Sequence, residues 1–364
     1  MDIKIIGTSK SNEAVKKDEF DIFGGRIAGL GAGKGSLEAV FAEDISKTQR
    51  RIKQVKSALR SDVFEHNVIT ISLVGIPKIL AMMLAAEKQC SVSGMSFADV
   101  EENLTGKEKV LYQKWVDIFK NRIAKSLSGT ASTITAPRME SIARYYSEYL
   151  LSVFTKTNVI LSCNYKSFNY LIAAFERFLL EENKGEIETR LVPFVEEIET
   201  KLREMPYYDV DLVKLSRVSG ASLFANGRKS EEYFGDVYSV SYKASLMALA
   251  ESQSYRNVSY SFNYEDVEYY IPEIIAGSSF AELWISDLKE LEKNIPQANI
   301  VDVIEVGVFD DFVLKYETRK SDKPIEMESI VDNVFKKYEY ALRMKIHPRA
   351  EELIKYNKTN SDNQ

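Results

Sequence analysis

The sequence contains little histidine and little cysteine, which restricts the chemistry open to it. Its 364 residues include only two histidines, His66 and His347, and two cysteines, Cys90 and Cys163. Two histidines argue against a histidine-rich metal site and against a Ser-His-Asp triad, so we expect no metal site. Two cysteines fit free thiols in a reducing cytosol rather than a disulfide framework.

Long apolar runs are also missing. The chain has no stretch of about 18 consecutive apolar residues, and it does not open with a charged segment followed by an apolar run and a cleavage site. We therefore predict a soluble, cytoplasmic protein with no membrane partner.

Neither sign of charge dominates the sequence. It has 48 lysines and arginines against 54 aspartates and glutamates, a net charge of -6, and its basic residues are spread along the chain. Proteins that bind a phosphate backbone usually show a basic stripe, so we predict no extended nucleic-acid partner. A site for one nucleotide needs only a few local cations and remains open. The length and the 45% hydrophobic content predict a large core and two or three domains.

A glycine-rich stretch at residues 24–36, GGRIAGLGAGKGS, fits neither common phosphate-binding pattern. In the P-loop register, Ala28 occupies the first glycine position and Gly35 follows Lys34 where Ser or Thr belongs. The dinucleotide pattern fails because Lys34 replaces its third glycine. We predict a flexible or functional loop here.

Hydrophobic periodicity predicts an alternation of strands and helices. Strands are expected at residues 2–7 and 68–74. Helices are expected at residues 36–60, 77–88, 106–127, 138–154, 166–182 and 186–203. The polar residues 357–364 are expected to form a disordered tail.

Residues 64–100, FEHNVITISLVGIPKILAMMLAAEKQCSVSGMSFADV, carry the most informative pattern. A Phe-Glu-His turn leads into a β-branched strand, a Gly-Ile-Pro bend, an apolar helix and a Ser-rich loop. This order resembles the core of the flavin-dependent thymidylate synthases, whose apolar helix ends in an Arg-His-Arg motif followed by serines. Here Ala-Glu-Lys at residues 86–88 replaces Arg-His-Arg, or Ala-Ala-Glu at 85–87 if the alignment is counted from His66.

The resemblance implies reductive methylation of dUMP to dTMP, or a related pyrimidine-nucleotide modification. FAD would be the cofactor, and NADPH and methylenetetrahydrofolate the co-substrates, with the protein mainly binding and orienting them. It also implies a homo-oligomer, since the family builds each active site between subunits. The lost cations and the added Glu87 predict weak or absent FAD binding, because a charge-assisted hydrogen bond is worth roughly 1.5–3 kcal/mol.

The resemblance also assigns roles to individual residues. The catalytic candidates are Ser96 and Arg144, the cofactor-binding candidates are Glu65, His66, Asn164 and Arg256, and the substrate-binding candidates are Ser91, Lys166, Arg177, Ser259 and Arg319. Asn158 competes with Asn164 for the family's Asn-x-Arg-Ser step. Each candidate also has a purely structural interpretation, such as a turn acid, a helix-surface arginine or a Ser-rich loop.

A second copy of the same plan follows in residues 237–272, with an alternating strand, an apolar helix and a Ser/Tyr-rich loop. We predict an α/β (α+β) fold of two tandem thymidylate-synthase-like domains, each a small mixed sheet flanked by helices. The copies would span residues 1–206 and 207–356. Chance similarity of two α/β segments is the alternative.

Two functions remain open from the sequence. In the first, Arg144 and Ser96 of one copy combine with Arg256 and Arg319 of the other in a composite active site. In the second, the chain is a catalytically inactive descendant that serves as a nucleotide-binding or assembly module.

Overall fold

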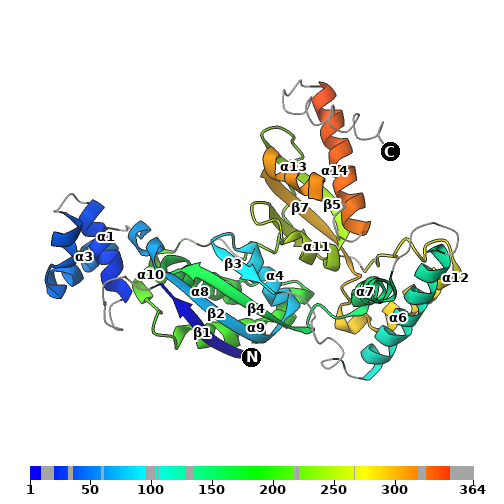
Figure 1. Cartoon of the computed structure of the whole chain (residues 1–364), viewed down its shortest axis with the longest axis horizontal. Helices are drawn as coiled ribbons and strands as arrows, with labels where there is room; N and C mark the ends of the chain where they lie inside the picture. The colour runs from blue at the N-terminus through cyan, green and yellow to red at the C-terminus, as the bar shows by residue number, and fades with distance from the viewer. Residues whose placement is uncertain are drawn as a thin grey trace. The chain divides into compact units, whose positions relative to one another are not determined.

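The computed structural model describes residues 1–9, 20–31, 36–58, 61–94, 104, 106–127, 135–216, 218, 221–265, 267–318 and 325–344. Within them the chain is a mixed α/β protein built on small antiparallel sheets flanked by helices (Figure 1). The tail expected at 357–364 lies outside these residues. No described helix combines the length and the apolar content that crossing a membrane requires.

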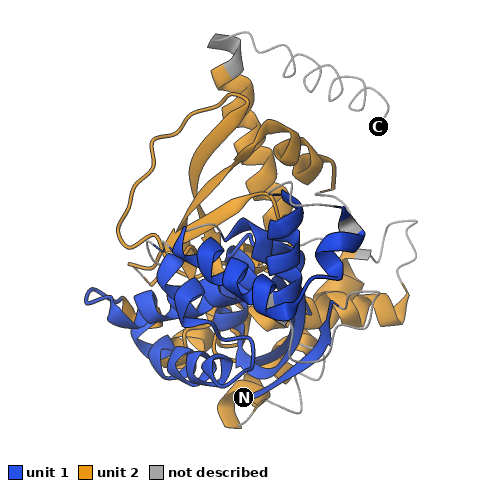
Figure 2. Ribbon diagram, turned by 90° about the vertical axis from the view of Figure 1, so that its left-hand side faces the viewer, with its two compact units in different colours: residues 1–97, 156–184, 188–221 blue, residues 98–155, 185–187, 222–364 orange. Residues whose placement is uncertain are grey.

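The chain divides into two compact units that interleave along the sequence (Figure 2). Unit 1 contains Met1–Phe97, Lys156–Lys184 and Glu188–Ala221, and unit 2 contains Ala98–Thr155, Gly185–Ile187 and Ser222–Gln364. The segment 98–155 therefore belongs to unit 2, although it precedes the boundary predicted at residue 206. The boundary at residue 206 was predicted between two similar stretches of sequence, and it stays a prediction.

Unit 1 is built on a sheet in the order β1-β2-β4-β3. The strands are β1 (Asp2–Thr8), β2 (Val68–Pro77), β3 (Cys90–Ser93) and β4 (Lys156–Asn164), and all neighbours are antiparallel. Helices α4 (Lys78–Ala86) and α8 (Tyr165–Leu180) pack on this sheet, and α9 (Glu186–Arg203) and α10 (Val210–Leu215) belong to the same part of the chain. Every residue of α4 is buried, which explains its continuous apolar run.

The glycine-rich stretch is a helix up to residue 31, so the loop predicted there is wrong for residues 24–31, and residues 32–35 lie outside the described part. Helix α1 (Phe20–Gly31) packs against α3 (Ile45–Ser57) and against the 3-10 helix η1 (Asp62–His66). A Cβ on Gly25 would lie 2.6 Å from Ile52, and one on Gly24 would lie 2.7 Å from the Phe64 ring. The glycines therefore permit close packing of α1 on its neighbours.

An ion pair ties α3 to the chain that precedes it. Helix α2 (Leu37–Phe41) ends just before Glu43, and Arg51 of α3 donates to both oxygens of the Glu43 carboxylate, with Nη2 at 2.8 Å from Oε2. These hydrogen bonds outweigh desolvation and lower the pKa of Glu43 to about 2. The Glu43 side chain is 7% exposed.

We predict that Glu43→Gln lowers the free energy of unfolding by about 1–2 kcal/mol at pH 7. This loss is smaller than the shift in the pKa of Glu43 implies, because nearby solvent screens the charges of the Glu43–Arg51 ion pair. A carboxyl whose folded pKa is depressed stabilises the fold above its unfolded pKa, and this stability is lost as pH falls from about 4.5 to about 2. Urea denaturation of both proteins across this range should therefore show their difference shrinking toward pH 2. The exposed Glu196→Gln is the control, and an equal loss in both variants would contradict the prediction.

Unit 2 is built on a second antiparallel sheet, in the order β5-β7-β6. Its strands are β5 (Val237–Ser245), β6 (Ser259–Asn263) and β7 (Ile300–Val308), and helices α11 (Leu246–Ser252), α13 (Phe309–Thr318) and α14 (Ile325–Met344) contact them or one another. A further group consists of α6 (Gly106–Leu127), α7 (Ala136–Ser147) and α12 (Ser279–Glu290). Trp115 and Trp284 meet edge to face in its core, with ring centroids 4.7 Å apart.

The two sheets share one plan. In each, a strand leads through a helix to a second strand that runs in the same direction, and a later strand lies between these two and runs in the opposite direction. Neighbouring strands are therefore antiparallel, and the expectation of mixed sheets is wrong because the third strand separates the two parallel ones. The registers agree as well. Ser91 pairs with Ser162, and Ser259 pairs with Val306, an offset of 144 (306 − 162) in the central strands.

A symmetric backbone contact lies just before the central strands, within unit 2. The Val153 N–H donates to the Ile295 carbonyl at 3.1 Å, and the Gln297 N–H donates to the Leu151 carbonyl at 2.8 Å. Both relations have the same offset of 144 (297 − 153 and 295 − 151). Two segments of unit 2 that lie 144 positions apart therefore contact each other reciprocally.

Candidate functional site

Four of the sequence candidates lie around the start of α8 in unit 1. The Lys166 Nζ lies 2.6 Å from Glu65 Oε1 in a partly exposed ion pair, and His66 is exposed next to Glu65 in η1. The Asn164 side chain accepts a hydrogen bond from the Ser167 N–H at 2.7 Å and so caps α8. The structure therefore brings these residues together, but Asn164 has a structural role and Lys166 is paired with an acid.

The other candidates of the first copy are not gathered at this place. Ser91 is exposed on β3, and Arg177 is exposed in the last turn of α8. Eleven residues separate Lys166 from Arg177, which corresponds to about 16 Å along the helix. Ser96 lies outside the described residues.

The segment that replaces Arg-His-Arg is partly buried. Ala86 ends α4 with 4% of its surface exposed, and Glu87 follows with 5% exposed. Burial, together with the nearby Glu87 carboxylate, raises the pKa of Tyr170 to about 12. A buried acid at this position does not fit a flavin diphosphate, because it repels the phosphates that the family's cations would hold.

Two candidates from the predicted second copy lie in and just after the turn that follows α11. Arg256 is half-buried in this turn, and Ser259 is exposed at the first position of β6. Arg319 lies outside the described residues, so the composite site predicted from Arg144, Ser96, Arg256 and Arg319 stays a prediction.

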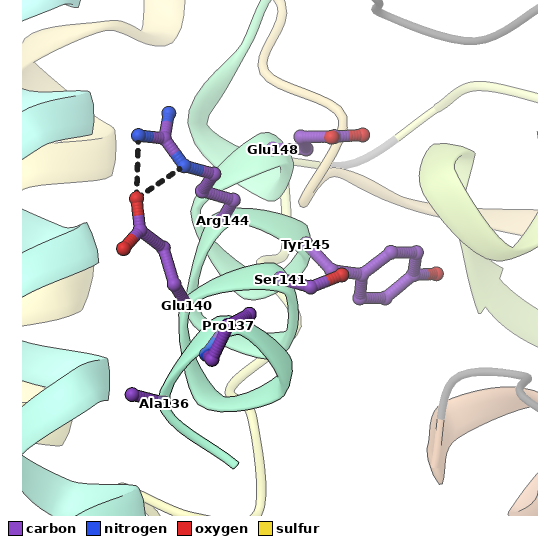
Figure 3. A pocket seen from close by; sticks show the side chains of 7 residues that line it. All are labelled: Ala136, Pro137, Glu140, Ser141, Arg144, Tyr145 and Glu148. Atoms are coloured by element: carbon purple, nitrogen blue, oxygen red, sulfur yellow. Dashed lines mark hydrogen bonds and ion pairs between the residues drawn. The ribbon is translucent and has the colours of Figure 1, made fainter.

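A pocket lies along α7 in unit 2, with a volume of about 640 Å³. Its described lining is Ala136, Pro137, Glu140, Ser141, Arg144, Tyr145 and Glu148. Figure 3 shows Arg144 and Glu140 on one flank of the helix and Ser141, Tyr145 and Glu148 on the other. Residues 137, 141, 144 and 148, at positions i, i+4, i+7 and i+11, lie on one face of the helix, and the two flanks border this face.

The two flanks offer different chemistry. Arg144 donates from Nε and Nη2 to Glu140 Oε1 at 3.2 and 2.9 Å, and its side chain is 39% exposed. These hydrogen bonds, with help from Lys120, lower the pKa of Glu140. On the other flank the Tyr145 hydroxyl is buried, close to the hydroxyl of Tyr149. Burial raises the pKa of this hydroxyl, which keeps it protonated.

The residue that follows this pocket along the chain, Tyr149, contacts a buried acid, Glu326. Tyr149, four residues after Tyr145, donates to Glu326 Oε2 at 2.9 Å. Ser245 donates to the same carboxyl from its hydroxyl at 2.7 Å and from its N–H at 2.8 Å. Burial nevertheless raises the pKa of Glu326. The sequence analysis missed Glu326, because no local pattern marks an acid at a helix start as buried.

Arg144 was found by motif resemblance, whereas Glu140 and Tyr145 were not predicted as site residues. Helical spacing carries a signal for Glu140, which stands four residues before Arg144, but not for Tyr145, which follows it directly. That spacing alone does not distinguish a pocket wall from a solvent-exposed helix face.

Comparison with known proteins gives distant likenesses of the fold. No protein-family model matches the chain, and no curated protein matches it. A UMP/dUMP methylase, PolB from Streptomyces cacaoi bound with 5-Br dUMP, is 15% identical with a TM-score of 0.35, covering 60% of this chain and 97% of its own. Thymidylate Synthase X from Helicobacter pylori with FAD and dUMP is 12% identical with a TM-score of 0.35, covering 59% of this chain and 99% of its own. These values assign no residue or activity to the present chain.

Proposed function

We propose that this protein binds dUMP or a related pyrimidine nucleotide in the α7 pocket, as a nucleotide-binding descendant of two fused thymidylate-synthase-like copies. The observation that carries the proposal is the pocket at Arg144, a residue that the sequence resemblance independently makes a catalytic candidate. The shared plan of the two sheets and the reciprocal contact at an offset of 144 support the duplication.

The lining suits the two ends of a mononucleotide. A guanidinium presents planar, paired donors that match two phosphate oxygens, so Arg144 would take the phosphate. Tyr145 lines the other flank, where the face of its ring would stack on the base. A volume of about 640 Å³ lies within the usual range for small-molecule sites.

Glu140 limits the affinity of this site. It accepts two hydrogen bonds from Arg144, and a phosphate must compete for the same donors. Glu148 adds a second acid to the lining. The nucleotide is therefore expected to bind weakly in the wild-type protein and more tightly when Glu140 is neutral.

Calorimetric titration of the full-length protein with dUMP and UMP tests the proposal. Arg144→Gln is expected to lower the affinity about tenfold or more, the worth of one charge-assisted contact. Glu140→Gln is expected to raise it, and Arg138→Gln, an exposed arginine of the same helix outside the described pocket lining, is the matched control. Equal affinities in Arg144→Gln and Arg138→Gln would remove the site from α7, and no heat with either nucleotide at millimolar concentration would end the proposal.

Reductive methylation of dUMP is the second candidate function. It is favoured by Arg256 and Ser259, which keep a cation and a hydroxyl at positions that correspond to Lys88 and Ser91 in the first copy. Tritium release from C5-labelled dUMP with FAD, NADPH and methylenetetrahydrofolate tests it, and Arg256→Ala should abolish any release. Nucleotide binding without release would favour the binding protein over the enzyme.

A further inference from the structure

Cys90 and Cys163 are the two cysteines of the chain, and they lie directly opposite each other on neighbouring strands. They are Cα partners in the antiparallel pair of β3 and β4 in unit 1. Neither cysteine is part of a disulfide, and 2% of Cys90 and 3% of Cys163 are exposed. Directly opposed residues of an antiparallel pair project to the same face, so the two thiols are neighbours on the buried face of the sheet.

Their backbone spacing is compatible with a covalent bridge. Opposed Cα atoms in antiparallel sheets lie about 5.5 Å apart in a hydrogen-bonded pair and about 4.5 Å apart in the other kind of pair. Disulfides span Cα separations of about 4.4–6.8 Å. A disulfide also needs Cβ atoms about 3.5–4.5 Å apart, which only the second, non-hydrogen-bonded kind of pair approaches. The Tyr165 N–H donates to the Asn67 carbonyl, so Cys163, two residues earlier, also turns its backbone groups toward β2, and its pair with Cys90 is of this second kind.

We propose that Cys90 and Cys163 form a reversible cross-strand disulfide, with a low-molecular-weight disulfide as the oxidant. One cysteine, as thiolate, attacks a sulfur of the oxidant, releases one thiolate and forms a mixed disulfide. The second cysteine then attacks the protein sulfur of that mixed disulfide and releases the other thiolate. The two cysteines are oxidised, the oxidant is reduced to two thiols, and these take up the two protons.

Burial slows this reaction without preventing it. β3 is an edge strand of four residues, paired only with β4 in the described sheet. Short edge strands separate from a sheet by local opening at a lower free energy than global unfolding. The bridge would then tie β3, which follows Glu87, to the end of β4, which leads directly into Asn164 and Lys166. Oxidation would thus fix the position of the segment at Glu87 relative to the segment at Asn164 and Lys166.

The experiment uses the full-length protein, reduced and then incubated with oxidised glutathione. After denaturation in N-ethylmaleimide, intact mass should show two alkylated thiols in the reduced sample and none in the oxidised one. Peptide mapping should find Cys90 linked to Cys163, and dithiothreitol should reverse the change. Because the bridge closes a long loop, the thermal midpoint should rise by about 5 °C or more on oxidation.

Two variants control for position. Cys163→Ala should take up at most one glutathione and show no rise in its thermal midpoint. Cys163→Ala/Leu161→Cys moves the second thiol two residues along the same face, where diagonal neighbours lie about 7–8 Å apart, beyond the reach of a disulfide. The proposal is overturned if the oxidised wild type keeps two alkylatable thiols, carries glutathione on both cysteines, or links no more than the displaced variant does.

Discussion

Replacing Lys315 with methionine is expected to lower the free energy of unfolding by about 3–5 kcal/mol, measured by urea denaturation. Lys315 and Glu305 form an ion pair in unit 2 with 1% and 0% of their side chains exposed. The ammonium donates to Glu305 Oε2 at 2.7 Å. Its removal leaves a carboxylate buried without a counter-charge, which is among the costliest changes in a protein interior.

Tyrosines complete the surroundings of this pair. The hydroxyls of Tyr238 and Tyr242 donate to the Glu305 oxygens at 2.6 Å each, and burial and Glu305 raise the pKa of both hydroxyls. Lys315 also lies 5.1 Å from the ring centroid of Tyr260. The tyrosines therefore remain protonated donors, but their hydrogen bonds do not replace the lost positive charge.

In unit 1 the positions with the same strand register carry apolar residues in place of this ion pair and its tyrosines. At the positions 144 residues before Glu305 and Lys315 it has Leu161 and Leu171, and Ile69 and Leu73 of β2 have the strand register that Tyr238 and Tyr242 have in β5. The quadruple variant Tyr238→Phe/Tyr242→Phe/Glu305→Leu/Lys315→Leu should therefore be far more stable than Lys315→Met, because it leaves no buried polar group unpaired. Leu171→Met, the same helix position in unit 1, should cost less than about 1.5 kcal/mol. Equal losses in the free energy of unfolding for Lys315→Met and Leu171→Met would show that water reaches the Lys315–Glu305 ion pair.

Trp284→Ala is expected to cost about 3–5 kcal/mol, because it removes a fully buried ring from the core of the helical group in unit 2. Trp284 of α12 is 0% exposed and contacts Trp115 and Phe119 of α6, with centroid distances of 4.7 and 5.7 Å. Its Nε1 also donates to the Tyr270 carbonyl at 2.8 Å, so alanine leaves both a cavity and an unpaired acceptor.

Hydrogen exchange should report where this loss is felt. If residues 98–155 belong to unit 2 as a folding unit, Trp284→Ala should reduce protection in both α6 and α12, although about 170 residues separate Trp115 from Trp284. Trp284→Phe, which keeps an aromatic ring, should have a smaller effect, and Tyr340→Ala at a site 71% exposed should have almost none. Faster exchange confined to residues 279–290 would contradict the interleaved arrangement.

The sequence predicted those elements whose signal is local. The helices at 106–127 and 186–203 have the bounds that periodicity predicted, and the strands at residues 2–7 and 68–74 are present with small extensions. The helix expected at 36–60 is divided in two, because Asp44 caps the start of α3 with a hydrogen bond from Ser46. Periodicity and capping act over a few residues, and a single sequence carries both.

The structure shows where some of the motif candidates lie, and their functional roles stay predictions. Ser91 pairs with Ser162 in β4, and Ser259 pairs with Val306 in β7. Arg144 lies in a pocket, and Glu65 contacts Lys166. An N-cap at Asn164 and an i, i+4 pair of Glu140 with Arg144 are both compatible with local sequence, but the sequence does not decide between these structural roles and ligand binding.

Long-range packing decided the rest. The sequence around Gly24 and Gly25 is typical of a loop. In the folded chain Phe64 and Ile52 pack against these two positions, and the absence of side chains there makes a closely packed helix favourable. Glu305 stands at an inward position of β7, but the sequence does not reveal that Lys315 and two tyrosines meet it there. Segment 98–155 joined unit 2 because its tryptophan finds a partner far along the chain. Local preferences set where helices and strands form, whereas the burial of apolar area and the pairing of buried polar groups set which of them pack together, and both depend on residues distant in sequence.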